Sequence, residues 1–394
     1  MKMTSLFPTF ILSLAAAVVL VLAACAAPQE TSGQRAERTA AEQPSEGEAR
    51  KAAAPLLRDD IRTLPDGTKY LVHPDEFRSG GPGKGGIGES GGIPALFEPT
   101  LIPAAEASYL TDEELVLGIV WKGEARAYPY QILVWHELAN DMIQGDPILV
   151  TYCPLCFTGI VFDATVEGKR ELFGVSGKLY NSELVMYDKS TESYWPQSLG
   201  KAVVGERTGT VLRKIPVDVT RWGDWKKAHP DTKVLSRETG FARQYGSNPY
   251  GSGRDFADIR FRLGVEKPDP RLPAQAIVYG VEAGGAFKAY PDAVVRELAV
   301  INDAVGGVPV VVWLDSAIGG PKAFLRTVEG KVLTFAGQDG LFVDEETATR
   351  WDADGVAVSG KLAGAQLERI VHEPVFWFAW AAFHPETALY SKAG

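Results

Sequence analysis

Two cysteines three residues apart, in the stretch TYCPLCFTG at residues 151–159, are the residues of this chain whose types and spacing most directly suggest chemistry. Thiolates bind soft metal ions and exchange with disulfides. Two thiols at this spacing can also form an inert disulfide or pack as small apolar groups. A β-branched run enters Cys153 and FTGIVFD leaves Cys156, so we expect a tight turn between two strands. In a thioredoxin-type motif the first cysteine instead begins a helix, whose dipole lowers the pKa of the thiol.

A metal centre at this turn needs more than two thiolates, because protein zinc sites are normally tetrahedral. His136, which lies 17 residues before Cys153, and Met186 on a later strand are the candidate further ligands. A Cys-Cys-His set, with or without Met, favours Cu(I), with Zn(II) next. Glu137 is then a candidate acceptor for the histidine N–H. Each also has an ordinary explanation: a hydrogen-bonded core histidine, a core methionine and a solvated carboxylate.

Three classes of function follow and stay open at the level of sequence. The first is a copper or zinc centre for metal binding, transfer or redox chemistry. The second is a thiol-disulfide oxidoreductase that uses Cys153 and Cys156 directly. The third is a non-enzymatic module that binds a glycan or peptide through exposed aromatic residues such as Tyr194 and Trp195. Whether the chain is an enzyme, and which protein or small molecule it meets, the sequence does not decide.

The N-terminus has the pattern of an export signal. A lysine near the start, an apolar run and small residues before Cys25 predict a signal peptide over residues 1–24. The ending Leu-Ala-Ala-Cys resembles the lipobox of bacterial lipoproteins, in which the cysteine is acylated and becomes the first mature residue. A simple membrane anchor is the alternative. We expect an exported protein, lipid-anchored to the cell envelope at Cys25, with Cys153 and Cys156 as its remaining thiols. Inner or outer membrane stays open.

Residues 25–56 are rich in Ala, Glu, Gln, Ser and Arg and lack apolar periodicity, which predicts a disordered tether. About thirty flexible residues have a root-mean-square reach of roughly 30 Å. Loss of Lys2 with the signal changes the formal net charge from −10 to −11. An acidic chain without a basic cluster argues against nucleic acid and against electrostatic binding to anionic lipids. The expected membrane contact is therefore the lipid alone.

The sequence contains an internal duplication. Shifting residues 123–150 by 162 positions aligns them with residues 285–312 without a gap, and the likeness continues toward the C-terminus after a six-residue insertion in the first copy. Order and spacing survive over more than a hundred residues. The matched pairs include Tyr128 and Tyr290, Asn140 and Asn302, Asp141 and Asp303, Asp188 and Asp344, Trp195 and Trp351, Trp225 and Trp380, and His229 and His384.

We predict an α+β fold, mostly β, made of two tandem related units. Each unit reads as a strand, a short helical stretch, a β-rich run and a tryptophan-containing helix before His-Pro. The N-terminal extension contains a glycine-rich loop without the spacing of a phosphate-binding loop. The expected segments are the extension at 57–114, the first unit at 115–236, a Gly/Pro connector at 237–276 and the second unit at 277–391.

The duplication is an internal control, because two copies share a fold but need not share a site. Pairs that both copies retain, such as the tryptophans before His-Pro, are expected to be structural. The candidate site residues are instead specific to the first copy, as a single site lost from the second would explain. In the second copy they are replaced as follows: His136 by Leu298, Glu137 by Ala299, Cys153 by Asp315, Cys156 by Ile318 and Met186 by Phe342.

The stretches GEARAYPYQILVWHELANDMI, PILVTYCPLCFTG, FGVSGKLYNSELVMYDKST and HPDTKVLS resemble the exported bacterial family catalogued as domain of unknown function 3179. The resemblance is strong over residues 70–240 and continues more weakly to 391. It carries no established activity, but it implies that the His-Glu, Cys-Pro-Leu-Cys and Leu-Val-Met-Tyr-Asp motifs belong together. This chain departs from the family pattern in a longer glycine loop and in Phe157, where many members place a smaller residue.

Overall fold

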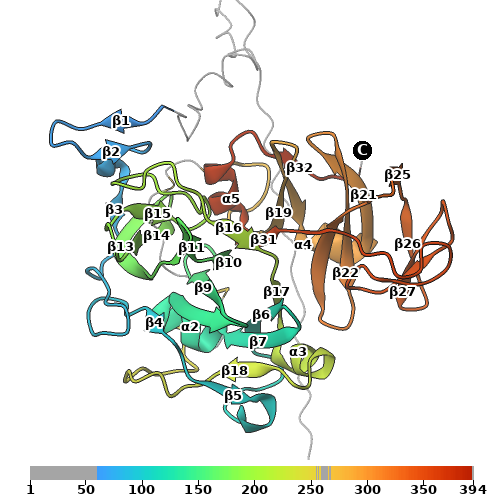
Figure 1. The fold of residues 1–394 in the computed structure, drawn as a ribbon, viewed down its shortest axis with the longest axis horizontal. Helices are drawn as coiled ribbons and strands as arrows, with labels where there is room; N and C mark the ends of the chain where they lie inside the picture. Colours follow the sequence, from blue (N-terminus) through green and yellow to red (C-terminus); the bar gives the residue numbers. More distant parts are fainter. Residues whose placement is uncertain (1–59, 254, 256, 259–264, 266–267, 393–394) are drawn as a thin grey trace, which may run out of the picture. The chain divides into compact units, whose positions relative to one another are not determined.

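Strands dominate the computed structural model, which describes residues 60–253, 255, 257–258, 265 and 268–392 (Figure 1). The expected signal peptide, tether and lipidated Cys25 lie outside these residues. Within them, no helix is long and apolar enough to cross a membrane. The α-helices of the described part each have seven residues: α2 (Tyr130–His136), α3 (Trp222–Ala228), α4 (Asp292–Leu298) and α5 (Trp377–Phe383).

Three sheets build the first unit, and the N-terminal extension adds an edge strand to each. The first sheet has the order β17 (Asp218–Arg221), β6 (Leu115–Trp121), β7 (Glu124–Pro129), β18 (Lys233–Leu235), β5 (Leu101–Pro103). The second has the order β16 (Arg213–Ile215), β10 (Thr158–Asp163), β9 (Asp146–Cys153), β8 (Leu138–Ile143), β4 (Leu96–Phe97). The third has the order β15 (Tyr194–Pro196), β14 (Glu183–Asp188), β13 (Phe173–Tyr180), β3 (Arg78–Ser79).

The second unit repeats this plan without the three edge strands of the extension and with one additional strand in its third sheet. Its first sheet has the order β31 (His372–Phe376), β19 (Ile277–Ala283), β20 (Ala286–Pro291), β32 (Ala388–Leu389). Its second has the order β21 (Val300–Val305), β22 (Val308–Asp315), β23 (Gly320–Leu325), β30 (Arg369–Ile370). Its third has the order β26 (Phe335–Gln338), β27 (Leu341–Asp344), β28 (Arg350–Trp351), β29 (Ala357–Ser359).

Short hairpins complete both units and the extension. The hairpin of β11 (Thr165–Val166) and β12 (Lys169–Arg170) recurs as β24 (Thr327–Val328) and β25 (Lys331–Val332). The extension also has the hairpin of β1 (Arg62–Thr63) and β2 (Lys69–Tyr70) and the 3-10 turns Pro74–Glu76 and Ala104–Glu106. The mostly β, duplicated fold expected from the sequence is what the structure shows.

The same buried hydrogen bonds stabilise both units, which explains why their residues recur. Buried donors that lose their acceptors are costly, so such pairs constrain both copies equally. The pairs are Tyr128 Oη to Asp141 and Tyr290 Oη to Asp303, Trp195 Nε1 to Asp188 and Trp351 Nε1 to Asp344, and Trp225 Nε1 to Thr232 and Trp380 Nε1 to Thr387.

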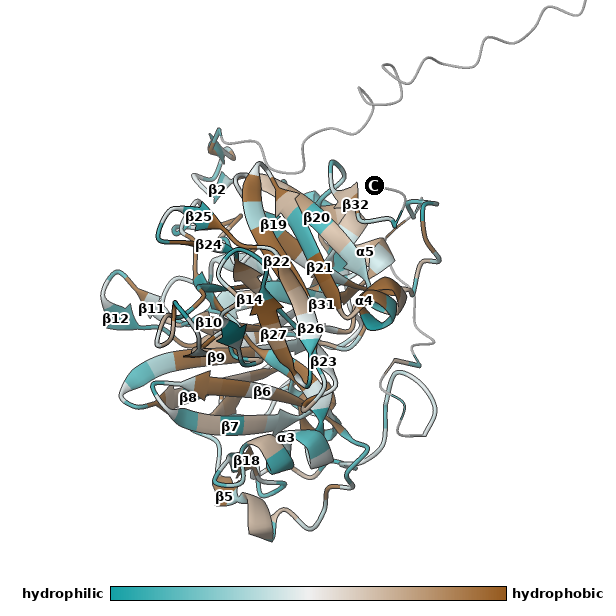
Figure 2. Cartoon of the chain, turned by 90° about the vertical axis from the view of Figure 1, so that its right-hand side faces the viewer, coloured by the Kyte–Doolittle hydropathy of each residue, from teal (hydrophilic) through white to brown (hydrophobic). Residues whose placement is uncertain are grey.

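Each closing helix packs a tryptophan onto a glycine of the central strand. A Cβ on Gly118 would lie 2.4 Å from the Trp225 ring, and a Cβ on Gly280 would lie 2.2 Å from the Trp380 ring. Strands β6, β19 and β22 each have four consecutive buried residues and are mainly brown in Figure 2. Truncating a tryptophan packed in this way to Ala costs about 3–5 kcal/mol.

The main hydrophobic core extends across both units. It contains Cys153, Cys156 and Phe157 of the first unit together with Phe376 and Trp380 of the second. All the described residues belong to one compact unit of the chain. The Cys-Pro-Leu-Cys turn is therefore part of the packing between the two copies.

Candidate functional site

The two cysteines lie on a hairpin turn, as the sequence predicts. Cys153 is the last residue of β9 and pairs with Thr158, the first residue of β10. Within the turn, the Cys156 N–H donates to the Cys153 carbonyl at 3.3 Å. A strand-turn-strand setting leaves no helix dipole to activate either thiol.

The turn closes with a residue in the left-handed backbone region. Phe157 has φ 58°, and its counterpart in the second unit, Gly319, has φ 63°. A bulky residue with positive φ is strained, by roughly 1–2 kcal/mol. Two ring contacts offset the strain: the Phe157 ring stacks on Phe376 at 5.5 Å between centroids and meets Tyr130 edge-on at 5.7 Å. Such strain is typical of functional sites.

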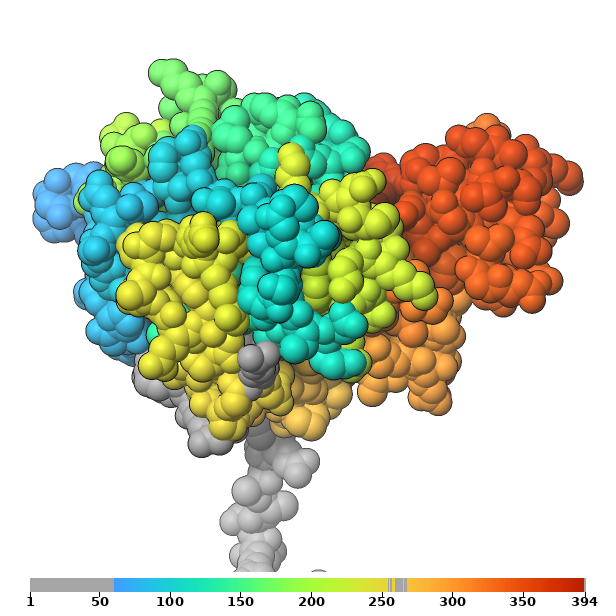
Figure 3. Space-filling model, turned by 90° about the horizontal axis from the view of Figure 1, so that it is seen from below, coloured from blue at the N-terminus to red at the C-terminus, as the bar shows by residue number. Residues whose placement is uncertain are grey.

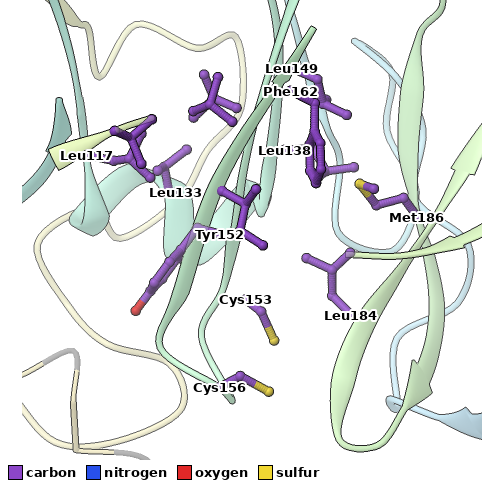
Figure 4. Close-up of a cluster of buried hydrophobic side chains, with 14 of the residues drawn as sticks. Leu117, Leu133, Leu138, Leu149, Tyr152, Cys153, Cys156, Phe162, Leu184 and Met186 are labelled. Carbon is purple, nitrogen blue, oxygen red and sulfur yellow. The ribbon is translucent and has the colours of Figure 1, made fainter. Parts of the chain in front are cut away.

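Both thiols are free, adjacent and shielded from water. Cys153 is 1% exposed and Cys156 is 0% exposed, and neither forms a disulfide. In Figure 4 their sulfurs point to the same side of the hairpin. Burial raises the pKa of the Cys156 thiol well above its usual range, and its hydrogen bond with Cys153 adds to that shift. The Cys156 thiol therefore stays protonated at neutral pH unless a bound cation replaces the proton.

The extra residues of the first copy cover this thiol pair. The hairpin β13–β14 has strands of eight and six residues, whereas its counterpart β26–β27 has four and four. Its turn residues Asn181 and Ser182 both have positive φ. The Cys156 thiol donates to the Ser182 carbonyl at 3.3 Å, and the Asn181 side chain donates to the Ala382 carbonyl at 3.2 Å. Two first-copy features that are separate in sequence thus meet.

His136 engages both ring nitrogens with groups other than the thiols. Nδ1 lies 2.8 Å from the Pro94 carbonyl, and Nε2 lies 2.6 Å from the Tyr245 hydroxyl. Because a carbonyl only accepts, Nδ1 carries the proton and Nε2 accepts from Tyr245. Burial lowers the pKa of His136 to about 4, so the ring is neutral at neutral pH. A metal at Nε2 would have to displace Tyr245.

Glu137 has a matching role beside it. It follows α2 with φ 58°, is 6% exposed, and accepts a hydrogen bond of 3.1 Å from the Tyr250 hydroxyl. Burial raises the pKa of Glu137 to about 7. Tyr245 and Tyr250 belong to the connector, whose described part forms much of the yellow surface in Figure 3. The His-Glu pair thus anchors the connector.

Met186 is completely buried on β14. In the view of Figure 4 its thioether points toward Leu138, and Leu184 lies between it and the thiols. In the part of the chain that the structure describes, no three His, Cys, Asp or Glu side chains are grouped so that they could hold a metal ion. The structure brings together Cys153 and Cys156 of the predicted set, and the larger set with His136 and Met186 stays a prediction.

Comparison with known proteins identifies the family. Residues 90–387 match the model described as protein of unknown function, DUF3179. The chain belongs to this family. No curated protein and no solved structure matches it. The resemblance expected from the sequence is confirmed, and the match covers most of both units.

Two buried tyrosines of this DUF3179 chain were missed in the sequence. The rings of Tyr130 and Tyr152 lie 4.1 Å apart, and neither hydroxyl has a hydrogen-bond partner among the described residues. Burial raises the pKa of Tyr152, and the charges of neighbouring Tyr130 and Cys153 raise it further. The same 162-residue shift replaces them with Asp292 and Leu314. Comparing the two copies position by position would therefore have identified both tyrosines as specific to the first copy.

The aromatic surface expected for a glycan- or peptide-binding module does not form at Trp195. That side chain is 0% exposed, and its indole N–H donates to Asp188 at 2.9 Å. Tyr194 is half-buried and packs against Phe77 at 5.7 Å between ring centroids. The prediction that Trp195 is exposed is wrong, because the residue instead repeats the buried Trp351–Asp344 pair of the second unit.

Proposed function

We propose that this protein binds a soft, thiophilic metal ion, foremost Cu(I), through Cys153 and Cys156. The observation that carries the proposal is the pair of free, adjacent and buried thiols on one rigid turn. Thiolates favour soft ions such as Cu(I), and Cu(I) is stable with only two of them. Zinc would need further ligands. The pair is therefore better suited to Cu(I) than to Zn(II).

The surroundings support metal binding over thiol exchange. A thiol that attacks a disulfide needs to be exposed and to have a lowered pKa. Cys153 and Cys156 are buried, and the pKa of Cys156 is raised. Burial instead keeps water and oxidants from a bound soft ion. Both thiols have to lose their protons on binding, so the affinity should rise with pH.

A competition titration tests the proposal. Reduced protein that starts after the tether is titrated with Cu(I) under anaerobic conditions against a chromogenic chelator. We expect one ion per chain, and loss of that binding in Cys153→Ser and in Cys156→Ser. His136→Ala is the matched comparison: two-thiol binding leaves its stoichiometry unchanged, whereas a ligand role for His136 weakens its affinity.

The opposite result would favour the thiol-disulfide alternative. In that case the reduced protein retains two titratable thiols without taking up Cu(I). It also forms and breaks its disulfide at a mild potential and reduces a model disulfide with little dependence on His136. Cu(I) uptake by the double variant Cys153→Ser, Cys156→Ser would reject the site itself.

We also propose that the protein is exported and lipid-anchored through Cys25. The support is the N-terminal pattern alone: a lysine, an apolar run and the ending Leu-Ala-Ala-Cys. Cys25→Ser should release a soluble form or leave an uncleaved precursor in the membrane fraction. Unchanged partitioning into detergent at the mature size would contradict the anchor.

A further inference from the structure

A cavity that neither thiol lines lies between the two units. Its volume is about 900 Å3, within the range of small-molecule sites. One wall comes from residues 198–216 of the first unit. The other comes from β19, β20, the β30–β31 region and the His-Pro end of α5. The cavity is therefore a product of how the two copies pack.

Two buried polar atoms that belong to cavity-lining residues have no partner among the described residues. They are Oε2 of Glu373, a residue that is 4% exposed, and Nε2 of His384, a residue that is 8% exposed. The other carboxylate oxygen of Glu373 accepts from Lys214, whose Nζ also donates to the Ser198 carbonyl at 2.7 Å. Buried polar atoms are normally satisfied, so these two atoms indicate a place for a ligand.

The remaining wall is apolar and aromatic. The Phe287 ring stacks on His384 at 3.9 Å between centroids, and Phe383 lines the same cavity. Burial lowers the pKa of His384 to about 3, so the imidazole adds no positive charge at neutral pH. An apolar body of one or two rings therefore finds matching surface beside the unpartnered atoms.

The charge around the cavity favours a cation. Among the described residues, the lining carboxylates Glu282, Glu368 and Glu386 form no ion pair. Burial raises the pKa of Glu373, Lys214 opposes that shift, and the negative charge of Glu282 adds to it. Of the four lining cations, three are neutralised by carboxylates and one, Lys201, forms no ion pair with a described residue. The neutralised pairs are Lys214–Glu373, Arg213–Asp163 and Arg369–Asp218. The free charges are predominantly negative, which attracts an ammonium group.

We propose that this cavity binds a small organic amine with an apolar body. Its ammonium group donates to Glu373 Oε2, and its apolar part packs against Phe287 and Phe383. The inference does not depend on the metal proposal, because no cavity residue is a thiol. A neutral hydroxyl compound or an organic acid of the same shape lacks the positive charge that the free carboxylates attract, so it should bind more weakly.

Benzylamine, benzyl alcohol and phenylacetate are matched probes for this selection. Titration of the protein at pH 7, followed by calorimetry or ligand-observed NMR, should show saturable binding of benzylamine. Because a hydrogen bond to a charged group is worth more than a neutral one, benzylamine should bind about tenfold or more tightly than benzyl alcohol. Phenylacetate should bind more weakly than both.

Substitutions of cavity residues test whether the probes bind in this cavity. Glu373→Gln should weaken benzylamine about tenfold or more and leave benzyl alcohol within about twofold. Because that change also removes the partner of Lys214, Phe287→Leu is a second variant that should weaken both neutral and charged probes. Glu329→Gln, in the turn between β24 and β25, is the control and should change nothing. Absence of saturable benzylamine binding, equal binding of phenylacetate, or an unaffected Phe287→Leu variant would overturn the proposal.

Discussion

The Cys-Pro-Leu-Cys turn and its counterpart in the second unit occupy the same place in the fold and contain opposite chemistry. Where Cys153 ends β9, Asp315 ends β22 and forms a buried ion pair with Lys322 at 2.8 Å. Lys322 also pairs with Asp354 at 2.5 Å. The first turn has a thiol pair in an apolar core, whereas the second has a buried ion pair. The hairpin corner therefore does not dictate its own chemistry.

What both turns keep is a backbone geometry and a contact with the other unit. The Cys156 carbonyl accepts from the Phe376 N–H at 2.9 Å, and the carbonyl of its counterpart Ile318 accepts from the Thr220 hydroxyl. Each corner thus bonds to the opposite unit, as in an isologous interface. The comparison teaches that packing between the units constrains the backbone and leaves the side chains at 153 and 156 free for function.

The largest expected effect concerns the ionic turn. Lys322→Met leaves Asp315 buried without its partner and should destabilise the protein by about 3–5 kcal/mol. Urea unfolding measures the change. Asp354→Asn, at a carboxylate with a side chain 64% exposed, should cost less than about 1 kcal/mol and is the control. If Lys322→Met lowers the free energy of unfolding no more than the control does, the buried ion pair does not stabilise the second turn.

The next effect follows from a carboxyl beside the thiol turn. Burial raises the pKa of Glu183 to about 8, although it accepts two hydrogen bonds from Ser198. The folded state therefore holds this proton more tightly than the unfolded state. Its stabilising contribution is full below about pH 4.5 and is lost as pH rises through 8.

Glu183→Gln removes this pH dependence. The variant should gain stability relative to the parent as pH rises from 4.5 to 8, reaching a few kcal/mol at pH 9. Thermal or urea unfolding across that range measures the difference. Asp339→Asn is the matched control, since Asp339 is the aligned position in the second copy and its side chain is 76% exposed. A difference that stays flat with pH would contradict the raised pKa.

The left-handed position sharpens the comparison further. Gly319→Ala should cost about 1–2 kcal/mol, because the backbone at this position has φ 63°, which an L side chain rarely adopts. An added Cβ would meet no close steric clash. Phe157→Gly should relieve a similar strain and lose its ring contacts, so its net cost should be smaller than that of an ordinary buried Phe truncation. Denaturant unfolding of both variants measures this. A stabilising Gly319→Ala would show that the left-handed backbone is not required.

The smallest effect tests the connector, which has no counterpart over the second turn among the residues that the structure describes. Tyr245→Phe removes the hydrogen bond to His136 Nε2 and should destabilise by about 1 kcal/mol. Because Tyr250 of the connector donates to Glu137 and lies close enough to Cys153 for their charges to interact, loosening the connector should also make alkylation of Cys153 and Cys156 faster. Mass spectrometry of alkylated native protein gives the rates. Unchanged alkylation would mean that the connector does not limit access to the thiols.

The sequence by itself determined the repeat, the mostly β fold, the strand-turn-strand setting of the cysteines and the family. These features depend on local periodicity, turn chemistry and spacing, which a linear pattern records. It also showed which residues the first copy alone possesses. Comparing the two copies identified Cys153 and Cys156 as specific to the first copy. The same comparison would also have identified Tyr130 and Tyr152.

Only the tertiary structure decided which of those residues meet. His136 is the last residue of its helix. Its ring forms hydrogen bonds with Tyr245, 109 residues later, and with the Pro94 carbonyl. No local pattern predicts that partner, because it depends on how the connector docks. Met186 likewise takes the face of its strand that packs in the core. Burial then set the protonation of Cys156 and Glu137, since desolvation is a property of the packed fold and not of the sequence around a residue.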